Sequence, residues 1–199
     1  EVVSQHGGIY ASHIRNENVR LLKAVDEAME IGRRAKLPVH VSHFKSSGRD
    51  SWGLVRRAAE RIAAARKTGA HVTADQYPYV ASSTSLDATV IPTWARAGGR
   101  KELIRRLDDP EIGQRVRVAI AENLSRKENG SVLMIARYAK KPGWVGKSVA
   151  QIAEQEGVST VEIAVRVARG GGAAIVNFSM SEDDVRHIMR VPWVATASD

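Results

Sequence analysis

The sequence contains no cysteine among its 199 residues. This absence excludes disulfide bonds and zinc sites built on thiolates. No run of about 18 apolar residues occurs, so nothing in the sequence predicts a membrane-spanning helix. The start of the chain shows no signal-peptide pattern. We therefore expect a cytoplasmic protein with no membrane partner.

Aromatic residues are scarce, with four Trp, four Tyr and two Phe available for stacking on bases. The net charge of +8 is compatible with an anionic partner. However, Lys and Arg fall mainly in expected helices, as in Arg33-Arg34 and Arg56-Arg57. No nucleic-acid-binding motif occurs, so we expect solvated helix faces and no nucleic-acid partner. A content of 43% hydrophobic and 26% charged residues is typical of a globular protein.

Both ends of the chain look cut. The first residue is Glu1, followed by Val2-Val3, which resembles the interior of a domain. The last residue, Asp199, follows directly after an apolar run. We expect a fragment of a longer protein, and the sequence does not predict its oligomeric state.

The first third of the sequence alternates between strand and helix patterns. β-branched and apolar runs predict strands, and apolar residues at helical spacing predict helices. The expected strands are 7–14, 39–44 and 70–79, and the expected helices are 18–35 and 51–69. One strand plus one helix takes about 30 residues, which favours parallel strands joined by crossover helices. Both a (β/α)₈ barrel and an open doubly wound sheet fit this α/β pattern.

The middle of the chain is less regular. Residues 80–100 are rich in Ser, Thr, Pro and Gly and predict a loop. Ser159 followed by Glu162 predicts a capping box at the start of a helix. Further helices are expected at 101–128, 147–157, 160–169 and 181–190, and further strands at 131–139, 173–180 and 193–199.

Three of the expected strands end in a residue that can bind a metal. These are His13, His43 and Asp199. In a parallel barrel, functional residues lie at the carboxyl ends of the strands. His13 and His43 are one strand-helix unit apart, so we expect them on adjacent strands facing one site. Imidazole nitrogen and carboxylate oxygen are common zinc ligands.

Strand alternation in "VHVSHFK" places His43 and Lys45 on one face, above Val39 and Val41. His40 then points away, and we expect it to be a packing residue outside the barrel. His6, His71 and His187 are likewise expected to be ordinary hydrogen-bonded histidines. Tyr77 and Tyr79 either line a pocket or pack around Pro78, and Asp75 fits a core carboxylate that accepts backbone N–H groups.

Five segments together resemble the N-acyl-D-amino-acid deacylases of the amidohydrolase superfamily. They are "GGIYASHIRNE", "PVHVSHFKSSG", "ADQYPYVASST", "FSMSEDDV" and the closing "ASD", in this order. The resemblance implies an α/β fold, namely the C-terminal part of a (β/α)₈ metal-dependent hydrolase barrel, about strands 5 to 8. It also implies that 1–199 forms one partial barrel domain, and that 85–190 is an extended region between strands 7 and 8.

The resemblance also implies the roles of individual residues. His13, His43 and Asp199 match metal ligands for one or two zinc ions. Asp199 matches the general base that takes a proton from the metal-activated water and then protonates the leaving amine. A second group matches positions that bind the substrate, chiefly its carboxylate. This group consists of Lys45, Tyr77 and Ser83. The implied reaction hydrolyses a small-molecule N-acyl-D-amino acid to a D-amino acid and a carboxylate.

Parts of the family's site have no match in this chain. The His-x-His of strand 1 and the metal-bridging Cys are expected upstream of Glu1, and a substrate-binding Arg beyond Asp199. A whole barrel also needs roughly 250 residues. We therefore expect this stretch alone to be inactive. A cyclic-amide amidohydrolase of the dihydroorotase or hydantoinase type and a non-catalytic barrel fragment remain as alternatives.

Overall fold

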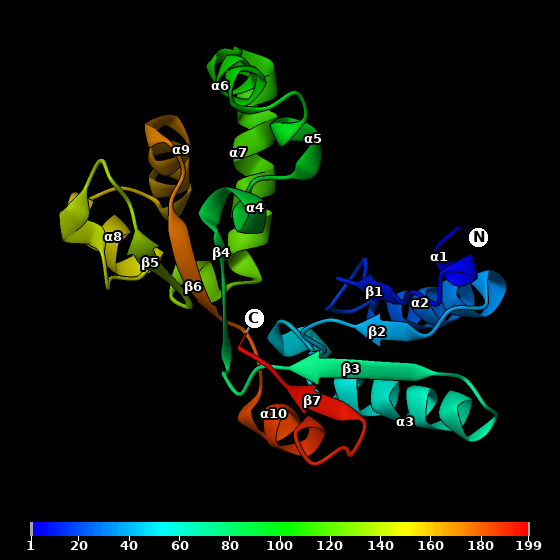
Figure 1. The fold of residues 1–199 in the computed structure, drawn as a ribbon. Coiled ribbons are helices and arrows are strands. Elements are labelled where there is room, and N and C mark those ends of the chain that lie inside the picture. The colour runs from blue at the N-terminus through cyan, green and yellow to red at the C-terminus, as the bar shows by residue number, and fades with distance from the viewer. Residues whose placement is uncertain (1, 199) are drawn as a thin grey trace. The chain divides into compact units, whose positions relative to one another are not determined.

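The computed structural model describes residues 2–198, which divide into two compact units. The first unit contains residues up to Val80 and those from Ser179 onwards, and the second contains Ala81–Phe178 (Figure 1). The predicted α/β class is confirmed. The second unit falls mostly within the predicted 85–190 region, but the helix after Ser181 lies in the first unit. No helix among the described residues has the length and apolar content needed to cross a membrane.

The first unit is built on a parallel four-stranded sheet with the order β1-β2-β3-β7. Its strands are β1 (Tyr10–Ser12), β2 (Val39–Val41), β3 (Val72–Gln76) and β7 (Val194–Thr196). Its helices are α1 (Val2–Gln5), α2 (Leu21–Ala35), the 3₁₀ turn η1 (Arg49–Ser51), α3 (Leu54–Lys67) and α10 (Glu182–Ile188). The predicted parallel pairing is confirmed, since β1, β2 and β3 pair in sequence order.

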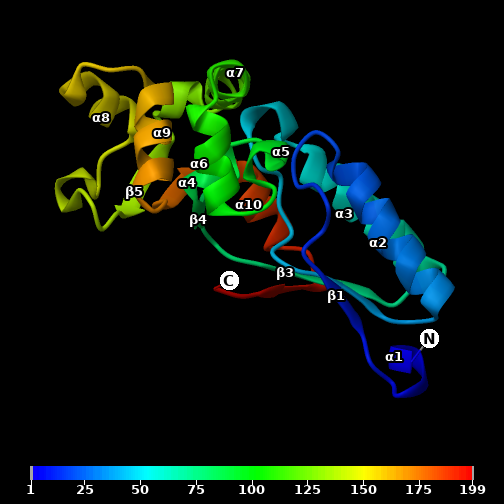
Figure 2. The same ribbon diagram turned by 90° about the horizontal axis from the view of Figure 1, so that it is seen from above.

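Helices α2 and α3 lie side by side on one face of this sheet (Figure 2). Their apolar stripes, including Val25 and Ile62, share a buried core with Val39 and Val41 of β2. Gly32 allows α2 to approach β2 closely, because a Cβ at this position would lie 2.1 Å from Val39 Cγ2. Burial of this apolar surface is the main force that holds the layers together.

The second unit contains an antiparallel sheet with the order β4-β6-β5 and its own core. Its strands are β4 (Ala81–Ser85), β5 (Leu133–Arg137) and β6 (Ala174–Phe178). Its helices are α4 (Leu86–Val90), α5 (Thr93–Arg96), α6 (Arg100–Asp108), α7 (Pro110–Ser125), α8 (Val149–Glu156) and α9 (Thr160–Gly170), with 3₁₀ turns η2 (Glu128–Gly130) and η3 (Pro142–Trp144). The predicted helices at 147–157 and 160–169 match α8 and α9 closely. The single predicted helix at 101–128 is wrong, because Asp109 has an extended backbone and caps a new helix that begins at Pro110, so α6 and α7 are separate.

The predicted loop at 80–100 is wrong, because it contains β4, α4 and α5. The Ser- and Thr-rich β4 gains its backbone hydrogen bonds from β6, about 90 residues later, and local composition does not reveal such a distant partner. The predicted capping box at Ser159 is half correct. Its hydroxyl accepts from Glu162 N, but the Glu162 carboxylate binds Arg166 and Arg117 instead. The reciprocal box occurs at Ser148 and Gln151.

Candidate metal centre

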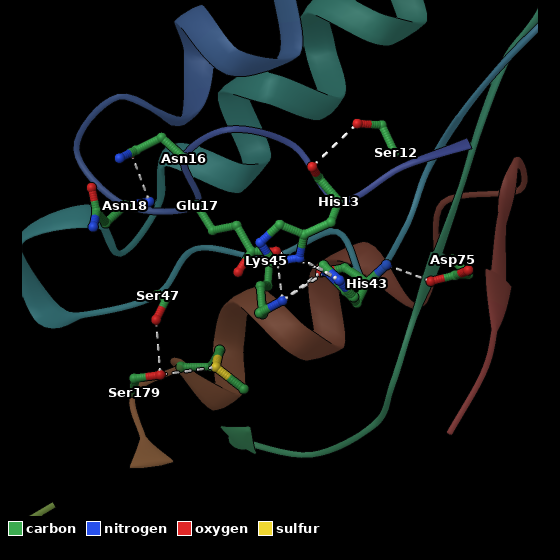
Figure 3. Close-up of polar contacts among 11 residues, drawn as sticks. Ser12, His13, Asn16, Glu17, Asn18, His43, Lys45, Ser47, Asp75 and Ser179 are labelled. Atoms are coloured by element: carbon green, nitrogen blue, oxygen red, sulfur yellow. Dashed lines mark hydrogen bonds and ion pairs between the residues drawn. The ribbon is translucent and has the colours of Figure 1, made fainter. Parts of the chain in front are cut away.

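His13 and His43 meet at the carboxyl ends of two neighbouring strands. His13 directly follows β1, and His43 lies two residues after β2, whose Val41 pairs with Ser12 of β1. His13 Nδ1 lies 2.7 Å from His43 Nε2, and the rings meet edge to face with centroids 4.5 Å apart (Figure 3). The predicted proximity of the two imidazoles is therefore confirmed, whereas their role as ligands remains a prediction.

His43 reaches this position through an unusual backbone conformation. Its φ of 41° lies in the left-handed region, which costs a non-glycine residue about 1–2 kcal/mol. Its N–H donates to Asp75 Oδ1 at 2.5 Å, while the next residue, Phe44, enters the core that α2 and α3 cover. The turn thus interrupts the strand alternation, so that Phe44 is buried and His43 faces His13.

The predicted faces of β2 are wrong for the same reason. Val39 and Val41 do not continue the face of His43, because they pack under the helices. His40 lies on the opposite face of the sheet, where its Nε2 is 2.9 Å from Asp75 Oδ2 and its Nδ1 is 2.8 Å from Thr73 Oγ1. His40 is therefore not an isolated packing residue, because it shares the Asp75 carboxylate with the His43 turn.

Glu17 is the residue of this cluster that the sequence did not reveal. It lies in the loop between β1 and α2, and its Oε1 is 2.7 Å from both His43 Nδ1 and Lys45 Nζ. Lys45 Nζ also donates to the carbonyl oxygen of His43 at 2.9 Å. The available signal was an acidic residue four positions after His13, in the loop that follows β1.

Both carboxylates are stabilised as anions. Burial of Glu17 opposes its ionisation, but the hydrogen bonds and charges of His43 and Lys45 outweigh burial and hold the pKa of Glu17 below its ordinary value. The pKa of Asp75 is also lowered, because its bonds to His40 and to the His43 N–H outweigh its partial burial. The cluster therefore offers acceptor oxygens beside two imidazole rings.

A small pocket with a cavity volume of about 10 Å³, roughly the room of one water molecule, lies next to this cluster in the first unit. Its wall includes His43, Lys45, Tyr77 and Tyr79. Tyr77 is buried, its ring stacks on Tyr79, and Lys45 Nζ lies 5.2 Å from the centre of the Tyr77 ring. The two tyrosines thus combine the two predicted possibilities, since they pack against each other and also line a pocket.

Two predicted site residues are not part of this cluster among residues 2–198. Ser83 is an exposed residue of β4 in the second unit, paired with Val176 of β6. Asp199 lies outside the described residues, so its predicted roles as metal ligand and general base remain predictions. Within residues 2–198, the group whose ligand atoms all lie within 4.8 Å of one another is His13, Glu17 and His43. Two imidazoles and a carboxylate form a donor set that suits zinc.

Comparison with known proteins agrees with this chemistry. The chain is 30% identical over 198 residues to an N-acyl-D-glutamate deacylase from Alcaligenes xylosoxydans xylosoxydans, and covers 33% of that protein. It matches the solved N-acyl-D-glutamate deacylase of Bordetella bronchiseptica, complexed with zinc and a phosphonate inhibitor, with a TM-score of 0.73 and 28% identity over the whole chain and 34% of that structure.

Over essentially its whole length, the chain is similar to N-acyl-D-amino-acid deacylases of the amidohydrolase superfamily. A solved D-aminoacylase, described as defining a subset of amidohydrolases, also matches 99% of the chain and 33% of that structure, with a TM-score of 0.69 and 27% identity. The chain thus spans about a third of the length of the relatives it matches. No protein-family model matches it.

Proposed function

We propose that this chain provides part of the active site of a zinc-dependent enzyme that hydrolyses N-acyl-D-amino acids. The observation that carries the proposal is the 2.7 Å approach of His13 Nδ1 to His43 Nε2 beside a pocket. Both nitrogens are of a type that zinc binds, and homologous enzymes act on such substrates.

His13, His43 and Asp199 are the proposed metal ligands in this chain. A zinc ion lowers the pKa of a bound water to about 7 and polarises a carbonyl group. Asp199 is the proposed general base, which takes a proton and returns it to the leaving amine. We also propose that the first unit corresponds to about strands 5 to 8 of a barrel. In this proposal, 85–190 is the extended region between strands 7 and 8.

Lys45 is the proposed contact for the substrate carboxylate, together with Tyr77 and Ser83. An ammonium group has three donors. Two of the Lys45 N–H groups donate to Glu17 Oε1 and to the His43 carbonyl oxygen, so the third N–H remains for a substrate oxygen. Its position in the pocket wall, 5.2 Å from the Tyr77 ring centre, supports this role.

The test measures release of free amino acid from N-acetyl-D-amino acids and from their L-enantiomers, using the gene product that contains this chain. We expect activity on the D-enantiomers alone, and a loss of at least about 100-fold in the Asp199→Asn variant. His71→Ala is the control, because His71 is an exposed residue that we place outside the site. Equal turnover of both enantiomers, or full activity of Asp199→Asn, would contradict the proposal.

A further inference from the structure

Glu17 has a contact pattern that the proposed reaction does not use. Its side chain is 15% exposed, and one oxygen, Oε1, lies 2.7 Å from both His43 Nδ1 and Lys45 Nζ. The His43 ring lies between two partners, with Glu17 at Nδ1 and His13 at Nε2 (Figure 3). Glu17 therefore approaches the ring from the edge opposite His13, and does not share the nitrogen that faces His13.

The 2.7 Å distance determines where the His43 proton lies. A carboxylate that accepts a bond from an ammonium group is ionised and has no proton of its own to donate. Two lone pairs facing each other at this distance would repel, so His43 Nδ1 carries the proton and donates it to Glu17 Oε1. In a neutral imidazole the other nitrogen, Nε2, then has the lone pair, and this nitrogen points at His13 Nδ1.

The same assignment explains the contacts of Lys45. Lys45 Nζ lies 2.9 Å from His43 Nδ1, and a protonated Nδ1 cannot accept a hydrogen bond from it. The ammonium instead donates to Glu17 Oε1 and to the His43 carbonyl oxygen. Because the Lys45 side chain is only 9% exposed, the negative charge of Glu17 offsets the cost of burying this cation.

We propose that Glu17 is a positioning residue, which holds His43 in its Nδ1–H tautomer and anchors Lys45, so that His43 presents Nε2 to a divalent cation shared with His13. This inference rests on the proposed function for the cation, but the tautomer itself is a property of the metal-free chain. Carboxylates that bind the second nitrogen of a metal-ligating histidine fix its orientation and raise its basicity.

The first experiment determines the tautomer in the ¹⁵N-labelled, metal-free gene product that contains this chain, by long-range ¹H–¹⁵N NMR at about pH 8, where an ordinary histidine is neutral. The His43 signals are assigned by their loss in His43→Gln. We expect the proton on Nδ1 in the wild type and in Glu17→Gln, whose amide oxygen still accepts. We expect a proton on Nε2, or a mixture, in Glu17→Ala. A proton on Nε2 in the wild type would overturn the inference.

The second readout is zinc affinity, measured by titration of the same variants. We expect Glu17→Ala to weaken zinc binding by about 10–100-fold, and Glu17→Gln to weaken it less. Glu30→Ala is the matched control, because Glu30 lies on the exposed surface of α2 and pairs with Arg33 and Arg34. Unchanged tautomer and affinity in Glu17→Ala would reject the role of Glu17.

The two readouts separate this inference from the proposed function. If the wild-type gene product that contains this chain binds no zinc, the proposed function fails, and the tautomer still decides whether Glu17 positions His43. If zinc binds to a chain whose His43 carries its proton on Nε2, the proposed function survives and the inference fails. If circular dichroism shows that Glu17→Ala does not fold, the inference is tested by the tautomer of the wild type and by the tautomer and zinc affinity of Glu17→Gln.

Discussion

The Asp75 carboxylate accepts a 2.5 Å hydrogen bond from the main-chain N–H of His43, on the neighbouring strand's terminal turn. This bond supports a left-handed residue, and the second oxygen of the same carboxylate is 2.9 Å from His40 Nε2. A strained backbone at the end of a strand thus presents an imidazole, and a carboxylate from β3 holds it there. Strained residues of this kind are frequent at functional sites.

Replacing Asp75 tests this support. We expect Asp75→Ala to lower the free energy of unfolding by about 1–2 kcal/mol, because the His43 N–H and His40 both lose their acceptor. Urea denaturation measures the change, and Asp50→Ala, at an exposed position of η1, is the control. Equal midpoints for Asp75→Ala and the wild type would show that the turn does not depend on this carboxylate.

Asp184 joins α10 to α3 within the first unit. Its Oδ2 accepts from the Gly53 N–H at 2.7 Å, its Oδ1 accepts from Arg56 Nε at 2.7 Å, and its side chain is buried. We expect Asp184→Ala to destabilise the chain by about 1–3 kcal/mol, since the partly buried Gly53 N–H and the Arg56 guanidinium lose a buried charged acceptor. The adjacent Asp183→Ala is a close control, because Asp183 is exposed on the same helix. A similar loss in both variants would refute the assigned role.

The stability of the second unit is expected to depend on pH through Glu162. Partial burial opposes ionisation of Glu162, but hydrogen bonds from Arg166 and Arg117 hold its pKa below the ordinary value of 4.5. A lowered pKa in the folded state stabilises the protein above the unfolded-state pKa, and this contribution is lost as pH falls through the folded-state pKa. The effect is expected to be about 0.5–1 kcal/mol, because the pair is partly exposed.

Comparison of the wild type with Glu162→Gln in urea measures this contribution. We expect the wild type to be more stable at pH 7, and the difference to shrink below about pH 4.5 as the carboxylate becomes protonated. Glu182→Gln, at an exposed i,i+4 pair with Arg186, is the control. A difference that stays constant down to pH 3 would mean that ionisation of Glu162 does not stabilise the fold.

Much of this architecture could be predicted from the sequence where local pattern decides it. Strands β1, β2 and β3 and helices α2 and α3 follow from apolar pattern, whereas α1 was not predicted. The 30-residue unit predicted that His13 and His43 would meet. Strand β4 could not be predicted, because its Ser- and Thr-rich sequence depends on pairing with the distant β6. Local composition carries little information about such long-range backbone partners.

The details of the candidate metal centre were harder to predict than its location. Alternation along β2 failed because the positive φ of His43 reverses which residues face the core. Glu17 was missed because its carboxylate reaches the cluster from a loop, where no periodicity applies. In both cases the deciding factor is a turn after a strand, whose geometry depends on tertiary hydrogen bonds.

The central claim is that His13 and His43 bind the same metal ion, and titration of zinc into the metal-free gene product that contains this chain tests it most directly. The account predicts zinc binding that weakens strongly in His13→Ala and in His43→Ala, with little further loss in the double variant, while His71→Ala binds like the wild type. Zinc binding that is unchanged in the double variant, or no binding by the wild-type gene product, would contradict the account.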